Sequence, residues 1–167
     1  CVVDGRGSPP WVEPVPTGPS SEYGRNNLEG VRLIAAVNPR HLIFRTSWVY
    51  AARGGNFAKT MLRLGQERDK LTVINDQIGA PTGADLLADV TAHAIRQVLQ
   101  QDQDELADTT AGIYHLVAAG ETNWFEYAKH VLAQAKQVQP AIQLKVTDIQ
   151  PVPTSAFPTP ARRPHNS

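Results

Sequence analysis

The sequence contains a single cysteine among its 167 residues, and this cysteine is residue 1. One cysteine can form neither an intrachain disulfide nor a cysteine-rich zinc site, so both of these stabilising devices are excluded. The chain also lacks an excess of charge of either sign, because 16 Lys and Arg balance 16 Asp and Glu. This balance removes the basic footprint expected of a nucleic-acid-binding protein. No apolar run approaches the about 20 residues of a membrane span, and we expect a cytoplasmic protein.

Several motifs that would indicate a particular reaction or cofactor are also missing from the sequence. The sequence has no Walker loop, no nucleophile elbow and no G-x-G-x-x-G turn. If the protein binds a dinucleotide, its phosphate-binding turn is outside these 167 residues. The five histidines show no metal-ligand spacing, and we expect His115, inside a predicted strand, to be a core residue. Asp85 and Asp89 lie near a predicted helix start, where acidic residues are favoured anyway.

The sequence does contain an alternation of helix and strand patterns. Apolar residues at helical spacing predict helices over about 22–37, 57–68, 84–100 and 123–136. Runs of strand-forming residues predict strands over 42–46, 71–75, 112–118 and 142–149. The breaker-rich segment 5–20 and the proline-rich tail from residue 151 are expected to be loops. This alternation predicts an α/β fold with a mainly parallel sheet.

Capping residues and apolar positions refine the helices. We expect Ser20 or Ser21 to cap the first helix, Asn56 the second and Thr122 the last. We expect the first and last helices to bury their apolar positions, which are Leu28, Val31, Ile34 and Ala35 in the first, and Trp124, Ala128 and either Val131 or Leu132 in the last. The sheet that this chain can build is expected to be incomplete and to leave apolar surface exposed.

The stretch SEYGRNNLEG, residues 21–30, is a candidate catalytic helix. A tyrosine and a lysine four residues apart on a helix can both face a nicotinamide cofactor. The lysine then holds the ribose and lowers the phenol pKa, while the phenol gives its proton to a carbonyl oxygen. Here Tyr23 is followed four residues later by Asn27, which can bind a ribose hydroxyl but carries no charge. Arg25 lies about 200° around the helix and cannot replace the lysine. The alternative is that Tyr23 merely packs against the proline-rich loop.

Trp48 and the loop 76–83 are candidate binding elements. Trp48 directly follows the predicted strand 42–46, and ligands of parallel sheets lie beyond the carboxyl ends of strands. Its indole could stack on a sugar ring or cover a nucleotide, or it could pack in the core. The loop DQIGAPTG, residues 76–83, follows another strand and could line the same site, or it could be an ordinary strand-to-helix turn.

Four long segments carry a family resemblance. They are HLIFRTSWVYAARGGNFAKTMLRL, LTVINDQIGAPTGADLLADVTAHAI, GIYHLVAAGETNWFEYA and VPTSAFPTPARRPHNS. In this order they resemble the dTDP-4-dehydrorhamnose reductases, which belong to the extended short-chain dehydrogenases/reductases. The resemblance implies reduction, by NADPH or in some members NADH, of the 4-keto group of a dTDP-linked deoxyhexose to give dTDP-L-rhamnose. It also implies part of a Rossmann-like doubly wound parallel sheet in residues 1–75 and a smaller C-terminal substrate-binding α/β subdomain mainly in residues 76–167.

The resemblance assigns roles to individual residues. Tyr23 matches the proton donor of the family, and Asn27 stands where the family has its cofactor-binding lysine. Trp48 matches the tryptophan that contacts the sugar, while Asn56 and Arg163 lie in motifs near the substrate nucleotide. CVVDG matches a strand end that follows a Ser-Thr-Asp triplet, so the catalytic threonine is expected just before residue 1. We therefore expect the cofactor-binding half and the final helix to lie outside this chain, and the chain by itself to be inactive.

Two further possibilities come with the resemblance. Some members use magnesium at a subunit interface, although no residue here establishes such a site, and a homodimer is compatible with the family. The family also resembles the regulatory subunit of methionine adenosyltransferase, which keeps the fold as an interaction module. Asn27 favours this second reading, in which the protein is a non-catalytic nucleotide- or partner-binding relative. The retained Trp48 and loops favour the reductase.

Overall fold

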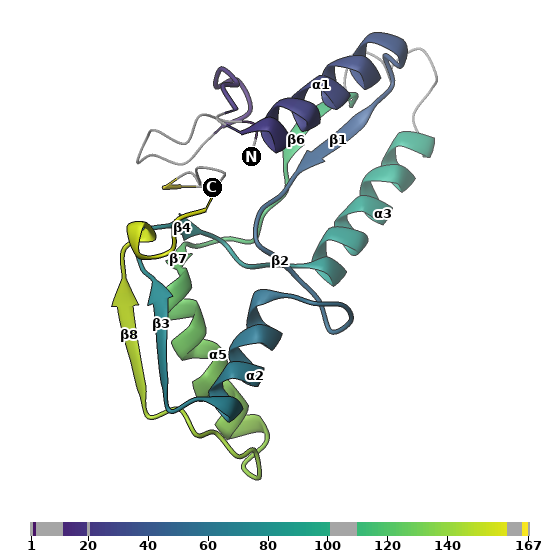
Figure 1. Cartoon of the computed structure of the whole chain (residues 1–167). Helices are drawn as coiled ribbons and strands as arrows, with labels where there is room; N and C mark the ends of the chain where they lie inside the picture. The colour runs from purple at the N-terminus through teal and green to yellow at the C-terminus, as the bar shows by residue number, and fades with distance from the viewer. Residues whose placement is uncertain (1, 3–11, 20, 101–109, 160–164, 167) are drawn as a thin grey trace.

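The structure is a computed structural model and describes residues 2, 12–19, 21–100, 110–159 and 165–166. Its helices and strands, in chain order, are α1 (Glu22–Val37), β1 (Leu42–Arg45), β2 (Val49–Tyr50), α2 (Phe57–Glu67), β3 (Lys70–Ile74), β4 (Ile78–Gly79), β5 (Thr82–Gly83), α3 (Ala84–Gln100), β6 (Gly112–His115), β7 (Thr122–Asn123), α5 (Trp124–Val138), β8 (Asp148–Val152) and the 3-10 turn η1 (Thr154–Ala156). Figure 1 shows α1, β1, β6 and α3 in the upper part of the molecule and α2, β3, β8 and α5 in the lower part.

The strands pair in parallel, as the sequence predicts. β1 pairs with β6, β2 with β5 and β3 with β8, all in parallel, whereas β4 and β7 are antiparallel. The prediction of an α/β fold with mainly parallel pairing is confirmed. Three of these pairs join the halves of the chain before and after residue 75, and the division of the chain at that residue stays a prediction.

Side-chain caps fix the starts of the helices. The Ser21 hydroxyl accepts a hydrogen bond from the Gly24 amide of α1 at 3.1 Å, which confirms one of the two predicted caps. The Asn56 side chain accepts from the Lys59 amide at 3.1 Å, which confirms the cap of α2. Each cap satisfies a backbone donor that has no partner within its helix.

The predicted cap of the last helix is wrong by one residue. Asn123, and not Thr122, accepts the hydrogen bond from the Glu126 amide, at 2.9 Å. Thr122 instead pairs with Gly79 in the β4–β7 ladder. The short antiparallel pair therefore extends to the helix start and moves the capping position one residue along the chain.

The last strand begins later than predicted and continues into the proline-rich tail. Residues 142–147 keep the predicted alternation of half-buried and exposed side chains but are not a strand. Their amides are used elsewhere, because Lys145 and Val146 both donate to the Gly65 carbonyl at the end of α2, at 2.9 and 3.0 Å. β8 then includes Pro151, opposite Val73. A proline is tolerated there because β8 has a ladder partner on only one side among the described strands.

The hydrophobic core lies in the lower part of the molecule, between α2, α5 and β3 (Figure 1). Its buried members are Met61, Leu71, Val73, Ala128 and Leu132. Helices α2 and α5 approach closely at Gly65, where an added Cβ would lie 2.7 Å from Leu132 Cδ2. The predicted burial of Ala128 and of one of Val131 and Leu132 is confirmed, the buried one being Leu132. Trp124, also predicted to be buried, is only partly buried against the same cluster, as is Val131.

The upper helices leave apolar surface exposed, as expected for an incomplete sheet. In α1, Leu28 is buried as predicted and Val31 and Ala35 are half-buried, but Ile34 is 48% exposed, which contradicts its predicted burial. The reason is that the two-stranded β1–β6 pair is too narrow to cover a whole helix face. In α3, Leu99 is 79% exposed. None of the helices in the described residues combines the length and hydrophobicity that a membrane span requires.

Candidate functional site

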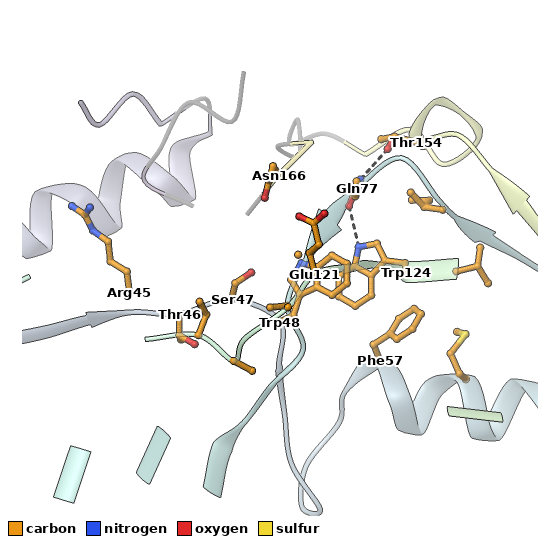
Figure 2. Close-up of a pocket in the computed structure, with 18 of the residues that line it drawn as sticks. Arg45, Thr46, Ser47, Trp48, Phe57, Gln77, Glu121, Trp124, Thr154 and Asn166 are labelled. Atoms are coloured by element: carbon orange, nitrogen blue, oxygen red, sulfur yellow. Dashed lines mark hydrogen bonds between the residues drawn. The ribbon is translucent and has the colours of Figure 1, made fainter. Parts of the chain in front are cut away.

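A cavity of about 870 Å³ opens beyond the carboxyl ends of three parallel strands. The loop after β1, the segment after β3 and the loop after β6 all contribute to its lining, with Thr46, Ser47, Trp48, Gln77, Gly79, Ala80, Val117, Ala118, Gly120 and Glu121. Figure 2 shows this lining around two stacked indoles. This is the position at which parallel α/β sheets bind their ligands. The loop 76–83 is therefore a part of the cavity wall and not only a turn.

Trp48 is held in the cavity wall by a constrained backbone and by two close neighbours. Its φ of 48° lies in the left-handed region, which is costly for a bulky residue. Its ring stacks on that of Trp124, with centroids 3.5 Å apart and planes 11° apart. On Gly79, an added Cβ would lie 2.5 Å from Trp48 Cε2, so the indole rests directly on a residue without a side chain. Trp48 thus lines the cavity and also packs against Trp124, while its contact with a sugar ring or nucleotide stays a prediction.

A chain of hydrogen bonds continues from the second indole (Figure 2). Trp124 Nε1 donates to Gln77 Oε1 at 3.1 Å, and Gln77 Nε2 donates to Thr154 Oγ1 at 3.0 Å. The Thr154 hydroxyl and amide both donate to the Asp76 carboxylate, at 2.5 and 2.9 Å. We did not single out Gln77, Trp124 or Thr154 as site residues from the sequence. The one available signal was that the polar pair Asp76–Gln77 immediately follows a strand.

The Asp76 carboxylate is stabilised in its ionised form. Partial burial acts to raise its pKa, but hydrogen bonds from the Thr154 side chain and backbone outweigh this effect. The pKa of Asp76 consequently lies below its ordinary value. Asp76 is therefore a charged acceptor that holds Thr154 through hydrogen bonds from its hydroxyl and its amide.

Charged groups lie at the β1–β6 side of the cavity. Arg45, the last residue of β1, lines the cavity, and its buried Nε has no hydrogen-bond partner among the described residues. The Glu13 carboxylate accepts from the His115 amide at 2.8 Å, and this bond is the main cause of a lowered Glu13 pKa. His115 is half-buried and lines the cavity, which differs from the core position expected for it. Its location follows from being the last residue of β6, where strand ends meet the cavity.

Tyr23 and Asn27 lie apart from this lining. Tyr23 is in the first turn of α1 with 72% of its surface exposed, and it lines neither cavity described here. Asn27 Nδ2 donates to the Tyr23 carbonyl at 3.0 Å. The neighbouring Arg25 Nε donates to Glu22 at 3.1 Å on the solvent side of the helix. That Tyr23 and Trp48 share a cleft stays a prediction.

Asn56 lies at a second, smaller cavity of about 560 Å³. Both polar atoms of its side chain serve the local fold, because Oδ1 caps α2 and Nδ2 donates to the Ala51 carbonyl at 2.7 Å. Ala118 lines both cavities, so the two are neighbours. Arg163, the other residue assigned to the nucleotide, lies outside the described residues.

The sequence pattern of the family described as "RmlD substrate binding domain" matches residues 1–167. The chain belongs to this family. It is 53% identical over 166 residues to the dTDP-4-dehydrorhamnose reductase of Escherichia coli K12, a match that covers 99% of this chain and 53% of that relative. The chain spans about half the length of the curated relatives that it matches.

Solved structures of family members share the fold. A dTDP-4-dehydrorhamnose reductase from Clostridium acetobutylicum is 34% identical with a TM-score of 0.83, covering 99% of this chain and 52% of its own. The Bacillus anthracis dTDP-4-dehydrorhamnose reductase, solved in complex with NADP, is 32% identical with a TM-score of 0.78 over the same shares. These matches confirm the Rossmann-like α/β class that the family resemblance implies.

Proposed function

We propose that the full-length protein is an NADPH-dependent dTDP-4-dehydrorhamnose reductase, and that this chain supplies its sugar-nucleotide site. The observation that carries the proposal is the indole-walled cavity at the carboxyl ends of the parallel strands. Sugar rings have apolar faces that stack on indoles, and the surrounding polar groups can orient the hydroxyls. Relatives at 52–54% identity that are named dTDP-4-dehydrorhamnose reductase support the choice of substrate.

Tyr23 is the proposed proton donor. As hydride adds to C4 of the ketosugar, the carbonyl π electrons move to O4, which takes the phenolic proton of Tyr23. The phenolate that remains is reprotonated from solvent. The exposure of Tyr23 at the start of α1 leaves its hydroxyl accessible to a substrate. Trp48 is proposed to hold the sugar ring while this transfer takes place.

NADPH, which supplies the hydride when bound, fits the described residues only at its nicotinamide end. Tyr23 is exposed, and Asn27 lies one helical turn further along the same face, within reach of a ribose hydroxyl. The sequence contains no G-x-G-x-x-G motif for the diphosphate. We therefore propose that the chain by itself does not reduce the sugar. NADH remains the alternative cofactor, and the described residues hold no cluster of three ligands for a metal such as magnesium.

The proposal is tested by the full-length protein with dTDP-4-dehydro-L-rhamnose and NADPH. We expect NADPH absorbance to fall and dTDP-L-rhamnose to form in equal amount. A folded protein that binds both compounds without turnover would contradict the proposal. The cytoplasmic location, the absence of membrane and nucleic-acid partners, and a homodimer remain predictions that fractionation and light scattering can check.

A non-catalytic relative is the second candidate, and Asn27 is the observation that favours it. Without a cation one turn after Tyr23, the site lacks a charge that would stabilise a developing phenolate. The variant Asn27→Lys distinguishes a weakened reductase from a non-catalytic binding protein. In a weakened reductase it should raise kcat by roughly tenfold or more. In a dedicated binding protein, tight NADPH binding should persist with no turnover in either form.

A further inference from the structure

The two indoles of the cavity are connected by hydrogen bonds to the segment that follows β8, through side chains that also line the cavity. Trp124 begins α5, Gln77 precedes β4, and Thr154 begins η1. These three segments are far apart in the sequence. The β4–β7 and β3–β8 pairs bring them together, and the hydrogen bonds from Trp124 to Gln77 and from Gln77 to Thr154 join their side chains. Gln77 is 9% exposed, so the loss of either bond would leave a buried polar group unsatisfied.

Each hydrogen bond in this series has only one possible direction. An indole N–H can only donate, which requires the Gln77 carbonyl oxygen to face Trp124. The Gln77 amide nitrogen must then face Thr154 Oγ1 and donate to it. Since an ionised carboxylate can only accept, the Thr154 hydroxyl proton points to Asp76. The orientation of Trp124 is thus set by a carboxylate two residues beyond β3.

The position of Trp124 in turn sets that of Trp48. The Trp48 indole stacks on the Trp124 ring and also lies directly against Gly79. Its backbone is in the left-handed region and is anchored by the hydrogen bond from the Thr82 amide to its carbonyl, at 3.1 Å. A residue in this conformation needs support from its surroundings, and the stacked ring supplies it.

We propose that Asp76, Gln77 and Thr154 are positioning residues, whose hydrogen bonds fix the stacked Trp48–Trp124 pair as the sugar-contacting wall of the cavity. Gly79 acts with them, because any side chain at this position would displace the Trp48 ring. The functional part of this inference rests on the proposed reductase activity. The structural part does not, since the geometry of the indole pair can be observed without turnover.

Thr154→Val and Thr154→Ser form a matched pair of variants for the test in the full-length protein. Valine keeps the shape but removes the hydroxyl, whereas serine keeps the hydroxyl, and both keep the amide bond to Asp76. Two indoles stacked at 3.5 Å give an exciton couplet in circular dichroism, and Trp48→Phe identifies this signal by abolishing it. We expect Thr154→Val to reduce the couplet by half or more and Thr154→Ser to retain it.

Steady-state kinetics provide the second readout. We expect Thr154→Val to lower kcat/KM for the sugar nucleotide by about tenfold, with an unchanged KM for NADPH, and Thr154→Ser to restore it. A couplet and a kcat/KM that Thr154→Val leaves intact would overturn the proposal, as would equal losses in the serine and valine variants. If the unmodified protein shows no turnover, the proposed function fails, while the couplet still decides whether the hydrogen bonds hold the indole pair.

The variant Gly79→Ala tests the placement of the Trp48 ring independently of the hydrogen bonds. The new methyl group would lie 2.5 Å from Trp48 Cε2, so the Trp48 ring would have to move away from its stacked position on Trp124. We expect the couplet to be lost. Gly83→Ala is the control, since a Cβ there meets the Tyr50 hydroxyl at an ordinary 3.5 Å and should leave the couplet unchanged. A full couplet in Gly79→Ala would overturn the proposed placement of Trp48 against Gly79.

Discussion

At the scale of single residues, the structure separates side chains that face the cavity from those that maintain the fold. Trp48 faces the cavity, as its position after a strand predicts. Asn56, which the family resemblance assigns to the nucleotide, uses both of its polar side-chain atoms in local hydrogen bonds. A motif match can therefore reflect a fold requirement as well as a ligand contact.

The variant Asn56→Ala measures how much the Asn56 side chain contributes to the stability of the fold. The variant loses the cap of α2 and the bond to Ala51, so we expect the full-length protein to lose about 1 kcal/mol of unfolding free energy in a denaturant titration. Asn56→Asp keeps a capping oxygen and should lose less. An alanine variant of unchanged stability would show that the Asn56 side chain does not hold α2.

The residue scale also marks the limit of sequence reasoning. The position of Trp48 after a strand and the capping roles of Ser21 and Asn56 can be predicted, because each depends on neighbouring residues in the chain. The hydrogen bonds among Gln77, Trp124 and Thr154 were not predictable, because they join segments up to 77 residues apart. Only the three-dimensional fold brings such groups together.

At the scale of elements, local patterns predict the helices well and the last strand poorly. α2 and α3 follow their apolar spacing and breakers, so their predicted ranges hold within a residue. The segment 142–149 alternates like a strand, but the Lys145 and Val146 amides bond to the last turn of α2 and not to β3. Alternation reports which side chains are buried, whereas a strand also requires a free ladder partner.

The hydrophobic core lies where α2 and α5 cross, and the variant Leu132→Ala tests this location. Leu132 is 4% exposed and packs within the buried cluster, so we expect a loss of about 2–5 kcal/mol in chemical unfolding of the full-length protein. Val138→Ala truncates a side chain at the end of the same helix that is 82% exposed and should change stability by less than about 0.5 kcal/mol. Equal losses in both variants would argue against this location of the core.

The Asp76–Thr154 contact joins the end of β3 to η1, and it should make stability depend on acidity. Because folding lowers the pKa of Asp76, its contribution is present above its unfolded pKa of about 3.9 and is lost as the pH falls through the lower folded value. We expect Asp76→Asn to be less stable than the unmodified protein at neutral pH, and the difference to shrink on acidification below about pH 4. A stability difference that does not change with pH would contradict this account.

At the scale of the whole molecule, the upper and lower parts differ in how completely they are packed. The core between α2, α5 and β3 is closed, whereas α1 and α3 present apolar side chains such as Leu33, Val37 and Leu99 to solvent. The chain spans about half the length of its curated relatives. The indole-walled cavity draws residues from both parts.

The central claim is that this indole-walled cavity is where the ketosugar binds for reduction. The most direct measurement is kcat/KM of the full-length Trp48→Ala variant for dTDP-4-dehydro-L-rhamnose, with Val49→Ala, an exposed neighbour outside the cavity, as the control. We predict a loss on the order of 100-fold for Trp48→Ala, with unchanged NADPH affinity and little effect of Val49→Ala. An unchanged kcat/KM in a folded Trp48→Ala protein would contradict the account.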